Sequence, residues 1–148
     1  MNTLFFKLLR FAIGAEKSLG VVPSKNEWQE LFTLCRKHSL LGVTFQGVER
    51  LQKTEGPDFK LLMKWIAITQ RMKSMNALQN LRCKELTEIF KKAGFRTCIL
   101  KGQGTSLLYP KPEYRQCGDI DIWVEGERDA VIDFAKQCGI NIRSIDIQ

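Results

Sequence analysis

The stretch "RTCILKGQGTSLLYPKPEYRQCGDIDIWVE", residues 96–125, decides the fold, because it ends in a strand pattern that carries two carboxylates. In "DIDIWV" (119–124) acidic and apolar residues alternate, which is typical of a strand with one buried face. Side chains two residues apart share a face of a strand, so Asp119 and Asp121 should point the same way while the isoleucines point into the core. The sequence thus places two acids at one spot on a sheet.

The segments around this strand predict a small unit of alternating strands and helices. β-branched and apolar residues, glycine-opened turns and a proline-rich stretch mark its parts. The expected order is a strand at 95–100, a short helix at 102–109, a loop at 110–118, the strand at 119–124, a helix at 127–137 and a final strand at 140–147.

The first 94 residues read as helices. Ser24 and Glu27 form a capping box that starts a helix with one apolar face, ending near His38. A short helix is expected at about 40–53, and a long one from Asp58 to Ala93, a span without proline or glycine. Its apolar positions predict one buried stripe along the whole length: Leu61, Leu62, Trp65, Ile66, Ile68, Met72, Met75, Leu78, Leu81, Leu86, Ile89 and Phe90.

The N-terminal "MNTLFFKLLRFAIGA" predicts an amphipathic helix that packs in the core, with a membrane-surface helix as the less favoured alternative. Lys7 and Arg10 interrupt its apolar run, which is too short and too charged to span a membrane. We therefore expect an α+β protein with no membrane span. A helical domain at 1–94 precedes the N-terminal part of a mixed β-sheet core with flanking helices at 95–148.

Composition and cysteine usage fit a cytoplasmic globular protein. The 148 residues are 44% apolar and 26% charged, which argues against disorder. The five cysteines are an odd number without a CxxC pair, so neither a disulfide framework nor a zinc site is indicated. The net charge of +7 lies in residues 1–94, which hold 16 Lys and Arg against 8 acids, whereas residues 95–148 hold 7 against 8. This surplus could attract phosphate-rich partners, but solvated lysines on helix faces are its commoner cause.

Two carboxylates on one strand face repel each other unless a cation lies between them. Hard oxygen ligands suit Mg²⁺ or Mn²⁺, which bridge to phosphates. The alternative is a strand edge whose acids simply face water. The upstream "LKGQGTS" favours the metal, because glycines let a phosphate approach the backbone and Lys101 adds a positive charge. Neither GxxxxGK[ST] nor GxGxxG is present.

The order "LKG", "LLYP", arginine and "GDIDIWV" resembles an uncharacterised bacterial nucleotidyltransferase family of the DNA polymerase beta superfamily, most clearly over 96–138. The resemblance implies metal-dependent transfer of a nucleoside monophosphate from an NTP to an acceptor hydroxyl, with Mg²⁺ or Mn²⁺ and an acceptor that the sequence does not name. Site residues carried over by motif are Asp119 and Asp121 as metal-binding catalytic acids, and Lys101, Gly102, Gly104 and Arg115 as phosphate-binding residues.

One feature departs from the resembled pattern. Enzymes of that superfamily carry a third carboxylate on a later strand, after a further hairpin, and here the only acid in the final predicted strand is Asp146. The resemblance therefore predicts that the sequence ending at Gln148 is a truncated catalytic core, inactive as it stands, with Asp146 as the third carboxylate being the less favoured alternative. Its last strand would lack a neighbour, so we expect self-association through residues 140–148.

Two other functions remain open at this point. The basic helices could form a non-catalytic module that binds RNA or a protein partner, with the sheet as scaffold. A weaker alternative is a toxin–antitoxin nucleotidylyltransferase that acts on RNA or protein. Binding to nucleic acid would weaken steeply with salt, whereas binding of an NTP at paired carboxylates would depend chiefly on Mg²⁺.

Overall fold

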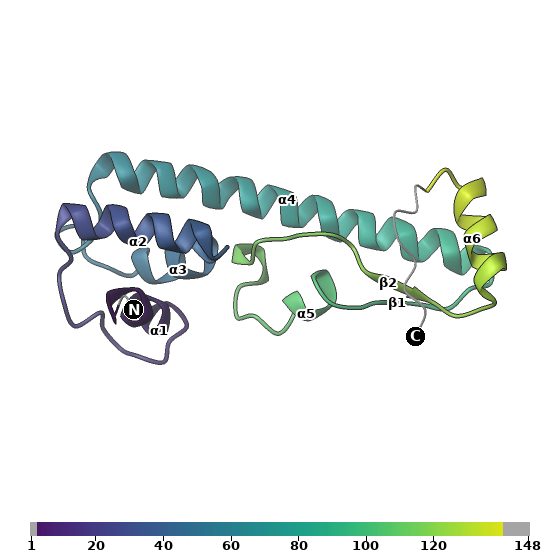
Figure 1. Cartoon of the computed structure of the whole chain (residues 1–148), viewed down its shortest axis with the longest axis horizontal. Coiled ribbons are helices and arrows are strands. Elements are labelled where there is room, and N and C mark those ends of the chain that lie inside the picture. The colour runs from purple at the N-terminus through teal and green to yellow at the C-terminus, as the bar shows by residue number, and fades with distance from the viewer. Residues whose placement is uncertain (1–2, 141–148) are drawn as a thin grey trace.

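The computed structural model describes residues 3–140 and shows an elongated α+β molecule organised along one helix (Figure 1). This helix, α4 (Phe59–Lys92), has 34 residues and is therefore about 50 Å long. Three helices pack at its N-terminal end, and a two-stranded sheet with its connecting segments lies along its C-terminal half (Figure 1). The final predicted strand at 140–147 falls almost entirely outside the described residues.

The helical end contains α1 (Thr3–Ala12), α2 (Lys25–Lys37) and α3 (Leu41–Val48). The predicted capping box is confirmed, since Ser24 accepts from the Glu27 amide and the Glu27 carboxylate accepts from the Ser24 amide at 2.8 Å. The N-terminal helix is confirmed as a core helix, with Leu8 fully buried. In residues 3–140 no helix is both long and apolar enough to cross a membrane. The five cysteines form no disulfide.

An aromatic cluster centred on Trp65 holds this end together. The Trp65 ring is fully buried and packs edge-on against Phe32 and Trp28, with centroids 5.3 and 6.3 Å away. Its indole Nε1 donates to the Leu41 carbonyl at 2.9 Å. The hydrogen bond gives the single polar atom of the ring a partner, while the rest of the side chain buries a large apolar surface. The cluster therefore fixes both α2 and α3 on the first turns of α4.

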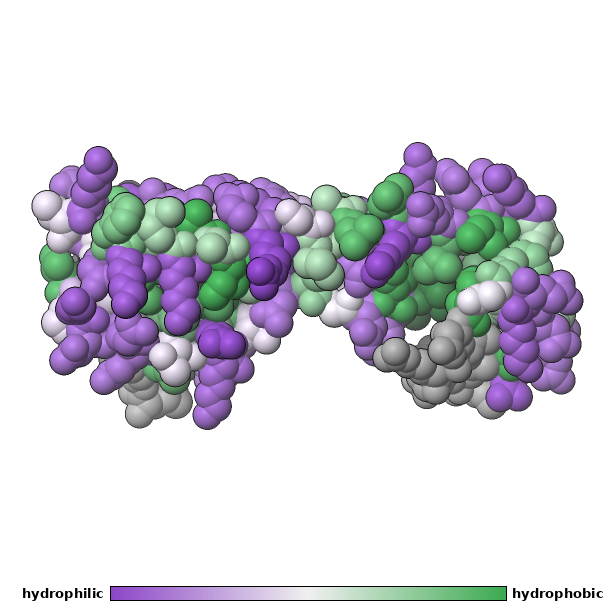
Figure 2. All heavy atoms as spheres, turned by 90° about the horizontal axis from the view of Figure 1, so that it is seen from above, coloured by the Kyte–Doolittle hydropathy of each residue, from purple (hydrophilic) through white to green (hydrophobic). Residues whose placement is uncertain are grey.

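The C-terminal half of α4 buries polar side chains, so the prediction of one continuous apolar stripe is wrong there. Asn76, Gln79 and Cys83 are its buried residues between Thr69 and Phe90. Four apolar residues of the predicted stripe are instead exposed: Met75, Leu78, Leu81 and Ile89. Viewed from the side of α4, the end of the molecule that carries this half shows a hydrophobic patch bordered by hydrophilic residues (Figure 2). The buried face turns toward loop carbonyl groups, which need donors rather than methyl groups.

The sheet pairs β1 (Thr97–Ile99) with β2 (Ile122–Val124) in antiparallel register, Cys98 opposite Trp123. The expected strand at 119–124 therefore begins three residues late. The chain after β1 turns away at Gly102, so only the Asp121 carbonyl still has a partner, the Leu100 amide at 2.9 Å. The mixed sheet is not seen in the described part, which has this antiparallel pair only.

Three further segments complete this end of the molecule. The connection between the strands contains α5 (Gln103–Ser106) and a 3₁₀ turn, η1 (Pro112–Tyr114). Helix α6 (Arg128–Gln137) follows β2 and returns to the end of α4. There Phe134 packs against Phe90 and Phe95, with centroids 5.4 and 5.5 Å away. These aromatic contacts hold the strands against the C-terminal turns of α4.

Gly42 allows η1 to lie against α3, and we expect Gly42→Ala to destabilise the protein. A Cβ at this position would overlap the Tyr114 carbonyl group, a backbone group that cannot rotate aside. Overpacking of this kind outweighs the helix propensity that alanine adds, so unfolding free energy should fall by about 2 kcal/mol. Chemical denaturation measures this loss. Gly56→Ala is the matched control, because its Cβ would meet nothing closer than 3.8 Å and should leave stability unchanged.

Candidate functional site

The turn after β1 brings a glycine against the acidic segment. Gly102 has φ 70° and ψ −109°, a backbone conformation that residues other than glycine rarely adopt. A Cβ on Gly102 would lie 3.2 Å from the Asp119 carbonyl oxygen. The glycine turn and the two-acid segment, which the sequence separates by 16 residues, are therefore direct neighbours in space.

Close packing explains why residue 104 is a glycine. A Cβ there would lie 2.5 Å from the Ile99 carbonyl oxygen, so only glycine lets α5 pack this closely on the end of β1. The packing accounts for the glycine without any ligand, and its phosphate-binding role stays a prediction. Because α5 has only four residues, its dipole adds little to anion binding.

Lys101 and Asp121 form the ionic part of the site. The Lys101 Nζ lies 3.7 Å from Asp121 Oδ1, and both side chains are accessible, at 77% and 40% exposure. Asp119 is also exposed. Lys101 thus places a positive charge beside Asp121, one of the two predicted metal-binding acids. Among residues 3–140, no three His, Cys, Asp or Glu side chains come together as a metal-binding group. Asp146 lies outside the described residues.

Two amide side chains on α4 hold the loop that leads to the acids, and the sequence analysis missed them. Asn76 Nδ2 donates to the carbonyl groups of Glu113 and Arg115, at 3.0 and 2.7 Å. Gln79 Nε2 donates to the Gly118 carbonyl at 2.6 Å, directly before Asp119. The remaining pair links the helix to α5, since Gln103 Nε2 donates to Asn80 Oδ1 at 2.6 Å. The spacing of Asn76, Gln79 and Cys83 on one helix face was the signal that could have revealed this polar buried face.

Arg115 lies in the same loop but is not joined to the two acids in the described structure. Its carbonyl is held by Asn76, and its guanidinium Nη1 is buried without a hydrogen-bond partner among residues 3–140. A guanidinium is a strong donor that needs an acceptor when buried. The predicted phosphate-binding role of Arg115 therefore stays a prediction, with its guanidinium beside the loop rather than paired to Asp119 or Asp121.

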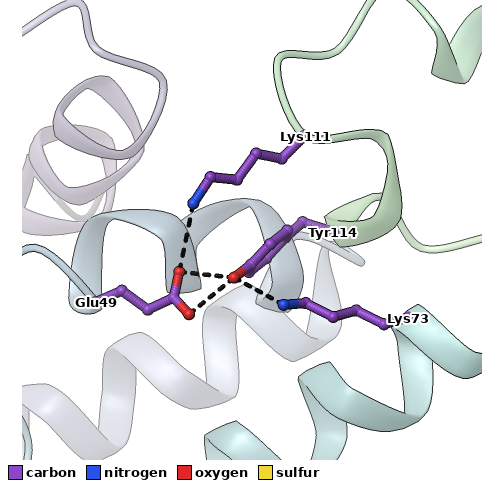
Figure 3. A network of polar contacts seen from close by, with 4 residues as sticks. All are labelled: Glu49, Lys73, Lys111 and Tyr114. Carbon is purple, nitrogen blue, oxygen red and sulfur yellow. Dashed lines mark hydrogen bonds and ion pairs between the residues drawn. The ribbon is translucent and has the colours of Figure 1, made fainter.

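A buried tyrosine connects the helical end to this loop (Figure 3). The Tyr114 hydroxyl donates to the Glu49 carboxylate, whose oxygens lie 2.7 and 2.8 Å away, and accepts from Lys73 Nζ at 3.0 Å. Lys111 Nζ completes the network 3.7 Å from Glu49. Burial of the ring, followed by the hydrogen bond to Glu49, raises the pKa of Tyr114. The hydrogen bond from Lys73 to Tyr114 raises the pKa of that lysine. The network joins α3, α4 and η1.

Comparison with known proteins identifies the family type. A family model described as "Uncharacterised nucleotidyltransferase" matches residues 24–143. This span starts at the cap of α2 and includes α4, the glycine turn and both acids, so it reaches further toward the N-terminus than the 96–138 motifs indicated. No curated protein and no solved structure matched the chain.

We expect Tyr114→Phe to lower the unfolding free energy by about 1–2 kcal/mol at pH 8, because Glu49 and Lys73 lose a buried partner. The folded-state pKa values of Tyr114 and Lys73 are both raised, so the stability that they contribute is complete below about pH 10 and is lost as pH rises through the folded values. The difference between wild type and Tyr114→Phe should therefore shrink above pH 10.

Urea denaturation at pH 8 and at several values above pH 10 measures this difference. The chain has two tyrosines, and Tyr109 is 40% exposed, so Tyr109→Phe is the matched control. Its pH profile should follow that of the wild type. A Tyr114→Phe protein with the stability of the wild type at pH 8 would contradict the network's role.

Proposed function

The chain belongs to the uncharacterised nucleotidyltransferase family, and we propose that it binds a nucleoside triphosphate across the glycine turn and the two acids for transfer of the nucleoside monophosphate. The acceptor oxygen would form a bond to the α-phosphorus, the bond from this phosphorus to pyrophosphate would break, and the hydroxyl proton would pass to solvent or a base. Nucleotidyl transfer is what the family match supports. The metal and the residue roles are the proposed part.

One observation carries the assignment of the site: Gly102 lies against the backbone of Asp119, with its Cβ position 3.2 Å from the carbonyl oxygen. A triphosphate that approaches the half-buried backbone at Gly102 would therefore also come close to the segment that carries the carboxylates. The Lys101 ammonium lies beside Asp121 and can contact phosphate oxygens. The groups proposed to bind phosphate and the carboxylates proposed to bind metal thus belong to two adjacent segments.

The donor set suits a hard divalent cation. Carboxylate oxygens are the ligands of Mg²⁺ and Mn²⁺ in phosphoryl-transfer sites, and Asp119 and Asp121 are both accessible. We assign these two side chains as the ligands of Mg²⁺ or Mn²⁺, which when bound neutralises phosphate charge and polarises the α-phosphoryl group. The ion pair of Lys101 with Asp121 supports this assignment, because Asp121 already faces a positive charge 3.7 Å away.

Within this proposal the chain's own residues position the triphosphate. Lys101 moves from Asp121 to phosphate oxygens, Gly102 leaves the backbone open to them, and the amides of α4 keep the segment before Asp119 at a fixed distance from the turn. In-line displacement depends on such positioning far more than on covalent participation of the protein. No described residue is assigned as the base for the acceptor hydroxyl.

Binding of ATP should stabilise the protein only when Mg²⁺ or Mn²⁺ is present and both acids are intact. Ligand that binds the folded state alone adds about 2.7 kcal/mol when its free concentration is about 100 times Kd. We expect this gain, measured as a rise in Tm, to disappear in the double variant Asp119→Asn with Asp121→Asn. The matched control is Asp129→Asn with Asp133→Asn, which removes two exposed acids from α6. An equal Tm rise in the first double variant would refute the metal assignment.

Lys101→Met should weaken binding of pyrophosphate while leaving the ligand-free Tm nearly unchanged. Its pair with Asp121 is exposed, and such pairs contribute roughly 0–1 kcal/mol to stability. Lys84→Met is the matched control, because Lys84 forms an exposed pair with Glu88 at 3.9 Å on α4. Calorimetric titration with pyrophosphate and Mg²⁺ compares the two. Similar affinity in both variants would remove Lys101 from the phosphate site.

A further inference from the structure

The outer face of the two-stranded sheet carries exposed apolar side chains directly beside Asp121. The register pairs Leu100 with Asp121 and Cys98 with Trp123, and alternation along each strand places these four side chains on one face. Leu100 is 46% and Trp123 48% exposed. The opposite face, toward α4, is partly buried. The face that carries Asp121 and Trp123 is thus the more exposed one.

Trp123 differs from the other tryptophans of the chain. The chain has three, and Trp28 and Trp65 are 1% and 0% exposed in the aromatic cluster of the helical end. Trp123 presents half of its surface to solvent two residues after Asp121 on the same strand face. A single exposed aromatic residue is common on protein surfaces and needs no explanation. Trp123, however, lies next to the charged pair of Lys101 and Asp121 on the same face of the sheet.

We propose that Trp123 is the stacking platform for the base of the bound nucleoside triphosphate, an inference that rests on the proposed function. Residues two apart on a strand are separated by roughly 7 Å along it. This offset is about what a ribose introduces between the α-phosphate, placed at Asp121, and the base. The nucleotide would lie along β2, with its phosphates at the Lys101 end and its base over the indole.

The surroundings of Trp123 favour a flat, uncharged ligand. Its cross-strand neighbour Cys98 is small, so the indole is not covered from the side of β1. Beyond it, Arg96 and Glu125 form an ion pair at 3.2 Å that neutralises the far end of the face. Stacking on an aromatic ring accepts any base, since every base has a π-face. The site would therefore bind different nucleoside triphosphates with similar affinity.

The full chain offers a direct test, because its two other tryptophans are buried. Acrylamide quenching of tryptophan fluorescence should report chiefly on Trp123. We expect ATP with Mg²⁺ to reduce the quenching constant, and pyrophosphate with Mg²⁺, which lacks a base, to leave it unchanged. Trp123→Phe should lose the quenchable signal. If ATP binds the protein but does not protect Trp123 from acrylamide quenching, the inference is wrong.

Affinities provide the second arm of the test. Trp123→Leu keeps an apolar side chain but removes the ring, so it should weaken ATP about tenfold, the size of one base-stacking contact, and leave pyrophosphate affinity unchanged. Trp123→Phe should retain most of the ATP affinity, and it serves as the folded comparison if the leucine variant is unstable. Leu108→Ala is the matched control, because Leu108 is 84% exposed and lies outside the site.

The outcomes distinguish failure of the stacking role of Trp123 from failure of the proposed phosphate site. If pyrophosphate and ATP both bind but the ratio of their affinities is the same in wild type and Trp123→Leu, the stacking role is wrong and the phosphate site remains. If neither ligand binds the wild type, the proposed function fails and the stacking role fails with it. A selective loss of ATP affinity in Trp123→Leu, together with protection from acrylamide by ATP alone, supports the inference.

Discussion

The buried face of α4 is the constraint on which the rest of the structure depends, and its chemistry changes along the helix. At the N-terminal end it presents Trp65 to an apolar cluster, where burial of aromatic surface provides the stabilisation. At the C-terminal half it presents Asn76 and Gln79 to loop carbonyl groups. The first part can repack with other apolar residues, whereas the second fixes particular backbone atoms, since each amide has a defined direction.

This change has a consequence for the loop from 110 to 118. Loops without secondary structure are usually mobile, because few buried contacts restrain them. Here three carbonyl groups, those of Glu113, Arg115 and Gly118, are bound by rigid helix side chains, and Tyr114 is buried in a polar network that reaches α3. Asp119 follows this tethered segment directly. The helical end therefore contributes to the site by holding the loop, although none of the predicted phosphate- or metal-binding residues belongs to it.

The sequence was sufficient for elements whose signals are local. The capping box at Ser24 and the span without proline or glycine from Asp58 to Ala93 located α2 and α4 to within about two residues. It was insufficient where a side chain depends on a distant partner. Tyr114 meets Glu49 across 65 residues, and Asn76 meets Arg115 across 39, so the sequence around each residue does not indicate which distant partner it contacts. The late start of β2 has the same origin, because it depends on where β1 turns away.

The ion pair between Lys101 and Asp121 bears on how easily the proposed site can be occupied. The two acids carry like charges, and the Lys101 ammonium offsets the charge of Asp121 without locking the site. Since both partners are exposed, separating them costs no more than roughly 1 kcal/mol. If Asp119 and Asp121 held a divalent cation, Lys101 would be free to contact a triphosphate, which offers it a stronger acceptor than a single carboxylate. Binding of the metal and of the nucleotide would therefore favour each other. The metal would neutralise the carboxylates, and the phosphates would neutralise the Lys101 ammonium that the metal leaves without its partner.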